Sequence, residues 1–197
     1  MATDPSYQAA IDRFRGLFER AMQLEVYEPA AVSLATVGPG GQPSVRTVLL
    51  RSFDERGFVF HTNSQSRKGR HMAENPQVAL CCYWDSLKEQ VLIEGIAEPL
   101  PDDESDLYWA SRHRDSRIAA WASMQSQRLE NRHVLESRFD EFEAKFEGGD
   151  VPRPPHWHGY RIAPRRIEFW QSRPARMHDR IVYEQAEGGW LVYRLYP

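Results

Sequence analysis

The sequence has few cysteines and no long hydrophobic run. Its 197 residues include two cysteines, Cys81 and Cys82, whose adjacency suits neither a disulfide framework nor a metal site. We expect both to be buried free thiols. No apolar segment approaches the roughly 20 residues needed to cross a bilayer, and residues 1–23 lack the basic and apolar regions of a secretory signal. These absences predict a cytoplasmic protein without a membrane partner.

Several widespread functional motifs are also missing. The chain has no G-x-G-x-x-G fingerprint, no P-loop and no G-x-S-x-G elbow, which removes the main support for a dinucleotide-binding protein or a hydrolase. His156 and His158 have a metal-like spacing, but no cysteine or carboxylate ligand is indicated nearby, so we predict no metal. A net charge of -3 argues against a sequence-independent nucleic-acid binder.

The patterning predicts one mainly β domain of the α+β class over residues 1–197. Asp4 and Pro5 resemble the start of a helix, within an N-terminal helical segment over residues 1–28. Residues 101–147 form a helical insertion, with apolar residues at three- and four-residue spacing. Short loops between the β-rich runs indicate an antiparallel meander or barrel. The predicted strands cover residues 31–36, 44–53, 58–62, 78–84, 90–97, 160–163, 166–170, 176–183 and 190–195.

The segment from Ile167 to Arg180 concentrates cations and aromatic residues. If residues 176–180 are extended, Arg176, His178 and Arg180 share one strand face. Two guanidinium groups beside an imidazole suit an anionic ligand. The alternative is an exposed edge strand whose charges prevent aggregation.

A second candidate lies around Ser66, which could cap a short helix running towards Asn75. Arg67 and Lys68 would then stand in the first turn, where the helix dipole disfavours cations. Their placement makes more sense if an external anion binds there, which suggests a phosphate site. The alternative is a solvated turn.

Three further groups of polar residues are candidates. Arg46 and Arg51 fall on opposite faces of a regular strand, and we expect at least one to meet a ligand or another chain. Tyr108, Arg112 and Ser116 would share one helix face if the helix continues through residues 112–114, and they offer donors for a phosphate. Such a face can also be merely hydrated. Residues 125–126, Gln-Ser, could contact a polar heterocycle or form a turn.

Taken in order, these motifs resemble those of the pyridoxine (pyridoxamine) 5'-phosphate oxidase family. The likeness extends from about residue 30 to residue 197. It rests on the segments Arg46–Arg51, Thr62–Asn63, Ser66–Lys68, Glu89–Val91, Gln125–Ser126, Ile167–Gln171 and Arg176–Arg180.

The resemblance implies a split β-barrel that binds FMN non-covalently at the interface of a homodimer. The implied FMN contacts are Arg46, Thr47, Val48, Leu49, Leu50, Arg51, His61, Thr62, Arg67, Lys68, Gln90, Gln125, Ser126, Trp170 and Arg180. The implied substrate contacts are Arg51, Tyr108, Arg112, Ser116, Arg176 and His178. Arg176 and His178 are the implied catalytic residues: Arg176 covers the substrate ring and His178 orients its polar groups.

The implied reaction oxidises pyridoxine or pyridoxamine 5'-phosphate to pyridoxal 5'-phosphate. A hydride passes to the flavin, dioxygen is reduced to hydrogen peroxide, and the amine substrate releases ammonia. The chain departs from the family pattern at Arg51, usually lysine, at His61, commonly tyrosine or phenylalanine, and at His158, usually glycine. Two alternatives share the fold: a flavin oxidase of secondary metabolism of the phenazine-biosynthesis type, and a non-catalytic protein that carries flavin, haem or pyridoxal phosphate.

Overall fold

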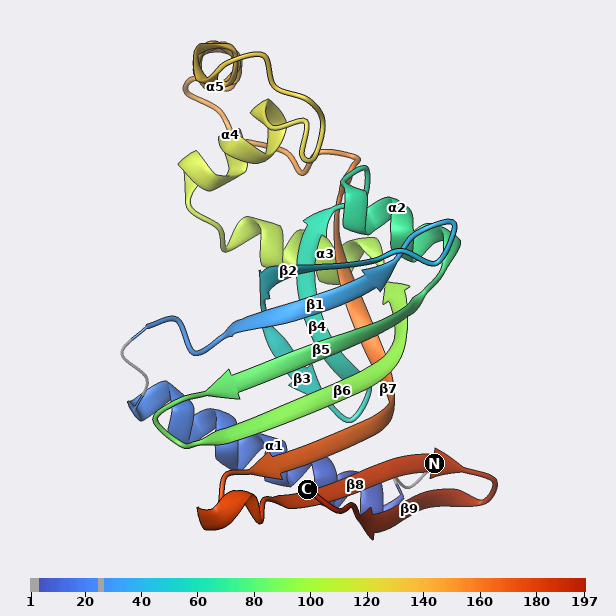
Figure 1. The fold of residues 1–197 in the computed structure, drawn as a ribbon. Coiled ribbons are helices and arrows are strands. Elements are labelled where there is room, and N and C mark those ends of the chain that lie inside the picture. Colours follow the sequence, from blue (N-terminus) through green and yellow to red (C-terminus); the bar gives the residue numbers. More distant parts are fainter. Residues whose placement is uncertain (1–3, 25–26) are drawn as a thin grey trace.

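The computed structural model describes residues 4–24 and 27–197 (Figure 1). Residues 1–3 and 25–26 of the predicted N-terminal segment lie outside the described residues. In chain order the elements are α1 (Pro5–Leu24), β1 (Ala31–Val37), β2 (Pro43–Leu49), β3 (Ser52–Asp54), β4 (Gly57–Asn63), α2 (Arg67–Glu74), β5 (Gln77–Trp84), β6 (Glu89–Pro99), α3 (Asp102–Ala110), α4 (Arg114–Ala122), α5 (Arg132–Lys145), β7 (Trp157–Gln171), the 3₁₀ turn η1 (Pro174–Arg176), β8 (Asp179–Ala186) and β9 (Gly189–Arg194).

The strands form one curled antiparallel sheet. In the described residues it has nine strands, with the order β2-β1-β5-β6-β7-β4-β3, and β8 and β9 continue from β7 as a side branch. The strand β7 is 15 residues long. Its first half pairs with β4, its second half pairs with β8, and β6 pairs with it from Tyr160 to Gln171. The prediction of a mainly β, antiparallel barrel with flanking helices is confirmed.

The main core lies between α1 and the concave face of the sheet. Asp4 caps α1, because its Oδ1 accepts hydrogen bonds from the backbone N–H groups of Ser6 and Tyr7 at 2.8 and 3.2 Å. Phe14 is fully buried and meets the rings of Phe53 and Phe58 edge-on, at centroid distances of 4.8 and 4.9 Å. The apolar stripe of α1 therefore closes the barrel at this end.

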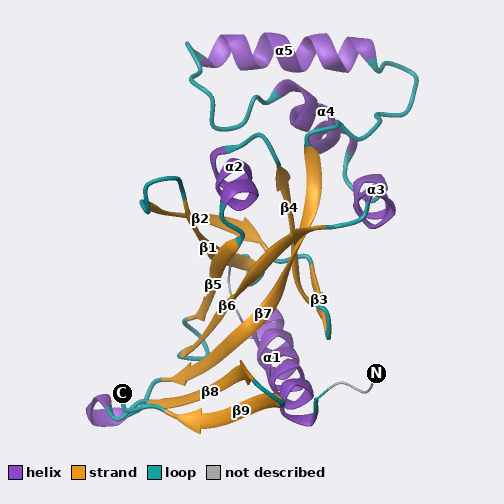
Figure 2. Cartoon of the chain, turned by 90° about the vertical axis from the view of Figure 1, so that its right-hand side faces the viewer, coloured by secondary structure: helices purple, strands orange, loops and turns teal. Residues whose placement is uncertain are grey.

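The helices α3, α4 and α5 lie at the opposite end of the molecule from β8 and β9 (Figure 2). They surround a smaller core built from Trp109, Ile118, Val151 and Trp157. Because Trp157 is the first residue of β7, this small core joins the helical insertion to the sheet. The helices predicted over residues 101–147 are present.

Three predicted elements differ in the structure. The strand predicted over 44–53 is interrupted, because Leu50 N–H donates to Ala30 O whereas Arg51 N–H donates to Val59 O, so the chain changes partner there. The argument that placed Arg46 and Arg51 on opposite faces of one strand is therefore wrong. Residues 160–163 and 166–170 belong to one strand, β7. The helix through Arg112 is also broken, since α3 ends at Ala110 and α4 begins at Arg114.

The predicted strand face of Arg176, His178 and Arg180 is likewise wrong. Pro174 starts a 3₁₀ turn, in which Ala175 and Arg176 have positive φ values of 56° and 61°. Strand β8 begins at Asp179, so Arg176 and His178 precede it. An extended backbone requires negative φ, and the turn therefore cannot place these side chains on one strand face.

Both cysteines are free, as predicted; Cys82 is buried but Cys81 is only half-buried. No helix in the described part of the chain is long and apolar enough to span a membrane.

Candidate functional site

The N-terminus of α2 carries a buried lysine. Ser66 caps the helix, its Oγ accepting from Gly69 N–H at 3.3 Å. Lys68 Nζ donates to Thr62 Oγ1 at 3.1 Å, Ser66 Oγ at 3.3 Å and Gln125 Oε1 at 3.0 Å. Burial, reinforced by the charge of Arg46, lowers the pKa of Lys68 to about 8. The predicted short helix and its cap are confirmed, and Gln125, which is distant in sequence, meets Thr62 and Ser66 around one ammonium group.

Arg46 adds a second cation beside Lys68. Its Nη1 donates to Leu34 O at 3.0 Å and to Thr36 Oγ1 at 2.8 Å, and its Nη2 donates to Ser44 Oγ at 2.7 Å. These acceptors are neutral. Burial and then the nearby Arg67 lower the pKa of the Arg46 guanidinium.

Among the residues that the structure describes, no carboxylate compensates this charge. Within residues 4–24 and 27–197, no acidic group lies within ion-pair distance of Arg46, Arg67 or Lys68. The positive end of the α2 dipole adds to the same field. Lys68 is buried, and a buried cation without a counter-charge is costly. With the half-buried Arg46 and the exposed Arg67 beside it, this group of residues is suited to receive an anion.

An aromatic stack lies next to this cationic group. The near-parallel rings of His61, Tyr108 and Trp157 form this stack: the His61 centroid lies 4.1 Å from that of Tyr108 and 4.9 Å from that of Trp157, and the latter two are 6.0 Å apart. Both of its ring nitrogens are buried without a hydrogen-bond partner. Burial, followed by the charges of Arg112 and Arg51, lowers the pKa of His61 to about 4, so the ring is neutral at physiological pH.

Two arginines flank the stack. The Arg51 guanidinium lies 5.8 Å from the Tyr108 ring centroid, and that of Arg112 lies 5.0 Å from the centroid of Trp157. Arg112 Nη2 also donates to the backbone carbonyl of Ser116 at 3.0 Å. The broken helix thus still brings Tyr108, Arg112 and Ser116 into one region, by a turn at residues 111–113 rather than by helical periodicity.

A pocket of about 200 Å³ is lined by Lys68 of the cationic group and by His61 and Tyr108 of the aromatic stack; Arg46 and Arg67 do not line it. An adjoining pocket of about 350 Å³ reaches Ser116. The smaller pocket is lined by Thr47, Val48, Leu49, Arg51, His61, Thr62, Lys68, Tyr108, Arg112 and Gln125. Of the predicted residues near it, Leu50 belongs to the main core, while Arg67 and Ser126 are exposed.

The remaining predicted residues form a second group around Trp170. Gln90 and Arg180 are the cross-strand neighbours of Trp170, and the His178 ring centroid lies 4.7 Å from that of Trp170. Arg173 N–H donates to His178 Nδ1 at 3.1 Å. Arg176 is exposed. Residues from three strands and one turn therefore converge at this place.

Arg180 is held by a buried carboxylate. Its Nε donates to Glu168 Oε1 at 2.7 Å, and Glu168 Oε2 accepts from Arg166 at 2.7 Å. Burial alone would raise the pKa of Glu168, but the hydrogen bonds from Arg180 and Arg166 outweigh it and lower that pKa. Glu168 thus fixes the orientation of a predicted flavin contact.

The two groups lie at opposite ends of β7. Trp157 begins this 15-residue strand and Trp170 is its penultimate residue, and a straight strand of that length spans about 50 Å. Although β7 is curved, α2 and α4 are clearly remote from β8 (Figures 1 and 2). The structure does not bring all predicted site residues together within one chain.

Sequence reasoning missed Trp157, Glu168, Thr36 and His71 as residues of interest. Trp157 and Glu168 stand inside or beside recognised motifs, so their positions were a usable signal. Thr36 and His71 contact each other across 35 positions of sequence, at 3.1 Å between Oγ1 and Nδ1. No local pattern could indicate that contact.

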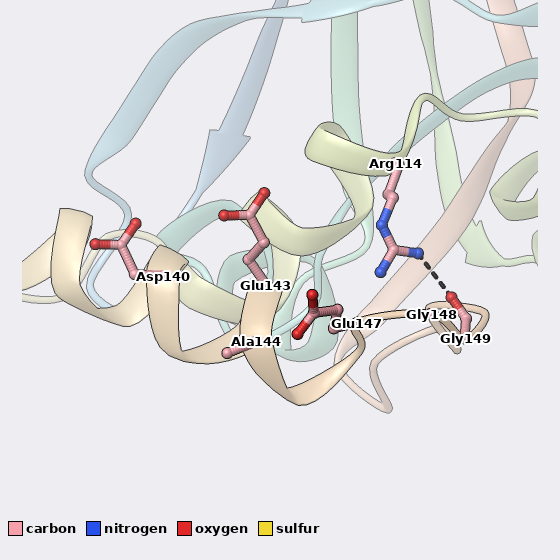
Figure 3. Close-up of a pocket in the computed structure, with 7 residues that line it drawn as sticks. All are labelled: Arg114, Asp140, Glu143, Ala144, Glu147, Gly148 and Gly149. Atoms are coloured by element: carbon pink, nitrogen blue, oxygen red, sulfur yellow. Dashed lines mark hydrogen bonds between the residues drawn. The ribbon is translucent and has the colours of Figure 1, made fainter.

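A separate pocket of about 560 Å³ lies between α5 and Arg114 (Figure 3). Three acidic side chains, Asp140, Glu143 and Glu147, line it. Arg114 is bound there to the backbone, donating to Gly149 O at 2.7 Å. The acidic lining disfavours a phosphate, so this pocket is not the predicted anion site.

Comparison with known proteins gives consistent results. Residues 18–146 match the family described as pyridoxamine 5'-phosphate oxidase, and residues 157–197 match the pyridoxine 5'-phosphate oxidase C-terminal dimerisation region. The pyridoxine/pyridoxamine 5'-phosphate oxidase of Myxococcus xanthus strain DK1622 is 54% identical over 187 residues, covering 95% of this chain and 91% of the relative. That of Alkalilimnicola ehrlichii is 52% identical over 192 residues, covering 96% and 98%.

Two solved structures share the fold. PhzG from Burkholderia lata 383, in complex with tetrahydrophenazine-1-carboxylic acid, is 33% identical with a TM-score of 0.87, covering 100% of this chain and 98% of that chain. An FMN-binding, pyridoxamine 5'-phosphate oxidase-related protein from Nostoc punctiforme has a TM-score of 0.74 at 18% identity, covering 93% and 97%.

Proposed function

Because the chain belongs to the pyridoxamine 5'-phosphate oxidase family, we propose that it oxidises pyridoxine or pyridoxamine 5'-phosphate to pyridoxal 5'-phosphate with bound FMN. Dioxygen is the final electron acceptor and yields hydrogen peroxide, and the amine substrate also yields ammonia. The observation that carries the proposal is the uncompensated cationic group of Arg46, Arg67 and Lys68 at the start of α2.

The donor set of this group fits the phosphate of FMN. Lys68 is buried among neutral acceptors, so a phosphate would supply the counter-charge that the described residues lack. Arg46 makes three hydrogen bonds, which leaves two of its five N–H donors for a ligand. Thr62 and Gln125 line the same pocket and complete its polar wall.

A second anion can bind beside the aromatic stack. Arg51 and Arg112 supply two guanidinium groups there, and the Tyr108 hydroxyl and Ser116 add further donors. We assign this group to the phosphate of the substrate. Arg51 replaces the usual lysine with a planar fork, which can bind a phosphate bidentately. Because His61 is neutral, the positive charge that attracts the anion here comes from Arg51 and Arg112 and not from the imidazole.

The homodimer follows from the separation of the two groups. Gln90, Trp170 and Arg180 lie too far along β7 to join the Lys68 group of their own chain. We propose that each FMN lies between the Lys68 group of one subunit and the Trp170 group of its partner. The matched dimerisation region begins at residue 157 and includes both β7 and β8, which supports this arrangement.

The residues then have distinct tasks. FMN supplies the two-electron acceptor for oxidation of the substrate C4' atom. Lys68 and Arg46 hold the flavin phosphate, and Arg51 with Arg112 hold that of the substrate. Arg176 and His178 enter from the partner subunit, where Arg176 covers the substrate ring and excludes water. His178 accepts from Arg173 N–H through Nδ1, so the proton of its neutral ring is on Nε2, ready to be donated to a substrate oxygen or nitrogen.

The second candidate function is oxidation of a larger ring system, as in secondary metabolism. The similarity to PhzG over the full chain favours it, and so do Arg51 and His61 where the family usually has other residues. The retention of Tyr108, Arg112, Ser116, Arg176 and His178 favours the vitamin B6 substrate, as does the higher identity to the pyridoxine/pyridoxamine 5'-phosphate oxidases.

The test is a flavin spectrum followed by a coupled peroxide assay. The purified protein should be yellow and should release peroxide and pyridoxal 5'-phosphate from pyridoxamine 5'-phosphate under air. Arg176→Ala should keep its FMN and lose most turnover. A flavin-loaded wild type that is inert towards both phosphorylated vitamers but oxidises a tricyclic substrate would replace the first function with the second.

A further inference from the structure

Behind the proposed flavin phosphate site lies a buried chain of three polar side chains. Arg46 Nη1 donates to Thr36 Oγ1 at 2.8 Å, and Thr36 Oγ1 lies 3.1 Å from His71 Nδ1. Thr36 is 0% exposed and His71 is 7% exposed. None of the three lines the pocket that contains Lys68, but Arg46 is only half-buried, whereas Thr36 and His71 are buried. The three hydrogen-bonded side chains can therefore reach a ligand only through Arg46.

Hydrogen-bond accounting defines the direction of this chain. A guanidinium can only donate, so Thr36 accepts from Arg46. Among the described residues, Thr36 Oγ1 has one other partner, His71 Nδ1, and a hydroxyl proton without an acceptor would be costly at a fully buried position. The hydroxyl therefore donates to Nδ1, and the imidazole carries its proton on Nε2.

The same chain joins the two elements that form the cationic group. Arg46 is on β2, Thr36 is on β1, and His71 is in the last turn of α2, the helix whose first turn holds Lys68. The hydrogen bond between Thr36 and His71 thus ties α2 to β1. The position of Lys68 relative to Arg46 depends on it.

Space for the His71 ring is provided by Gly38. A Cβ atom added at Gly38 would lie 2.7 Å from His71 Nε2, closer than side-chain packing allows. Any side chain at this position would have to displace the imidazole. A substitution at Gly38 therefore offers a third way to disturb the hydrogen bonds among Arg46, Thr36 and His71. Gly38 itself takes no part in those hydrogen bonds.

We propose that Thr36 and His71 are positioning residues that hold Arg46 and the α2 N-terminus in register, so that Arg46 and Lys68 bind the flavin phosphate together. This inference rests on the proposed FMN site. It concerns the phosphate alone, because Arg46 and Lys68 are the residues assigned to that part of FMN. Disturbing the chain should therefore weaken the binding of FMN and spare that of riboflavin, which lacks the phosphate.

The experiment measures the dissociation constants of FMN and riboflavin for the full-length protein freed of flavin, by fluorescence titration. Thr36→Val removes the hydroxyl and preserves the shape of the side chain, and His71→Leu removes the acceptor. Both should raise the Kd of FMN about tenfold and leave the Kd of riboflavin nearly unchanged, as expected for a charge-assisted hydrogen bond that loses its support. Gly38→Ala should act in the same direction.

Conservative variants provide the rescue. Thr36→Ser keeps the hydroxyl, and His71→Asn places an amide oxygen near the position of Nδ1; both should retain most of the preference for FMN over riboflavin. Ser33→Val, at an exposed position of β1, is the matched control for a valine on this strand.

Three outcomes would overturn the inference. One is equal loss of FMN and riboflavin binding, which indicates a purely structural role. Another is an unchanged ratio in Thr36→Val and His71→Leu proteins that remain folded by circular dichroism. If Thr36→Val does not fold, the FMN and riboflavin dissociation constants of His71→Leu and Gly38→Ala test the inference in its place. A wild type that binds riboflavin as tightly as FMN would overturn the proposed phosphate site as well, which distinguishes the two failures.

Discussion

The imidazole of His61 lies face to face with the phenol ring of Tyr108, with centroids 4.1 Å apart and planes inclined by 20°. The same imidazole lies 4.9 Å from the Trp157 ring, at an interplanar angle of 14°. His61 thus occupies an aromatic slot beside these two rings, but its two buried ring nitrogens have no hydrogen-bond partner. The stack gains dispersion energy from His61, but the burial of its polar edge costs free energy.

His61→Phe should therefore stabilise the flavin-free protein. The substitution keeps an aromatic ring in the slot and removes both unpaired nitrogens, and we expect the free energy of unfolding to rise by about 1 kcal/mol. Chemical denaturation at pH 7 measures it. A lower stability would show that the nitrogens are satisfied or that the slot cannot hold the larger ring.

The pH dependence of this pair of proteins gives an independent check. The pKa of His61 is about 4 in the folded protein and about 6.5 in the unfolded chain. Between these values the unfolded state binds the extra proton, so wild-type stability falls as the pH drops from 6.5 to 4. The difference from His61→Phe should grow over this window, by at most about 3 kcal/mol. Parallel curves would contradict the assignment.

Binding of FMN should weaken in alkaline solution. The pKa of Lys68 is about 8 in the free protein, and a bound phosphate would raise it by stabilising the ammonium. Above pH 8 binding must take up a proton, so the Kd should rise up to about tenfold per pH unit. Titrations between pH 7 and 9.5 test this, with riboflavin as the control that lacks the phosphate. Lys68→Met should bind FMN weakly and lose this pH dependence.

Two carboxylates that pair with Arg166 should differ greatly in their effect on stability. Glu168 is 3% exposed and binds both Arg166 and Arg180, whereas Glu94 is 53% exposed and binds Arg166 at 3.0 Å. Glu168→Ala removes the buried carboxylate shared by two half-buried guanidinium groups and leaves Arg166 with Glu94 and Arg180 with the Tyr196 carbonyl; it should cost about 3 kcal/mol. Glu94→Ala is the matched control and should cost less than about 1 kcal/mol. Equal losses in urea denaturation would contradict this account of the Arg180 contact.

Two inactive variants should restore each other's activity if the site is shared. Lys68→Met damages one end of the molecule and Arg176→Ala damages the other. In a mixed dimer one site contains both intact ends, so co-expression should recover about a quarter of the wild-type peroxide production. The control pair, Lys68→Met with Arg46→Ala, damages the same end in both subunits and should recover nothing. Failure of the first pair would place the whole site within one chain.

Much of the fold was predictable because local patterns determine it. Asp4 and Ser66 were recognised as helix caps from residue type alone, and both cap their helices in the structure. Alternating apolar residues separated by turn residues located most of the strands. The predictions of secondary structure are wrong where the backbone conformation of a residue differs from that of the residues around it. Ala175 and Arg176 adopt positive φ without being glycine, and no propensity rule predicts such a turn.

The candidate site was predictable as a set of residues but not as an arrangement. Clustered guanidinium and ammonium groups indicate an anion-binding site through their chemistry alone, whichever helices or strands carry them. Their relative positions depend on long-range contacts: His61 meets Trp157 only because β4 pairs with the first half of β7. The sequence pattern does not show that residues 157–171 form one continuous strand. The length of that strand separates the two groups.

A site shared between two subunits, as proposed above, would have a genetic consequence. A subunit damaged at one end of β7 would leave one intact site when it pairs with a normal subunit. A subunit damaged at both ends, such as one carrying Lys68→Met and Arg176→Ala together, contributes one defective end to each of the two sites. It would abolish both, and would act as a dominant-negative allele in a cell that also expresses the wild type.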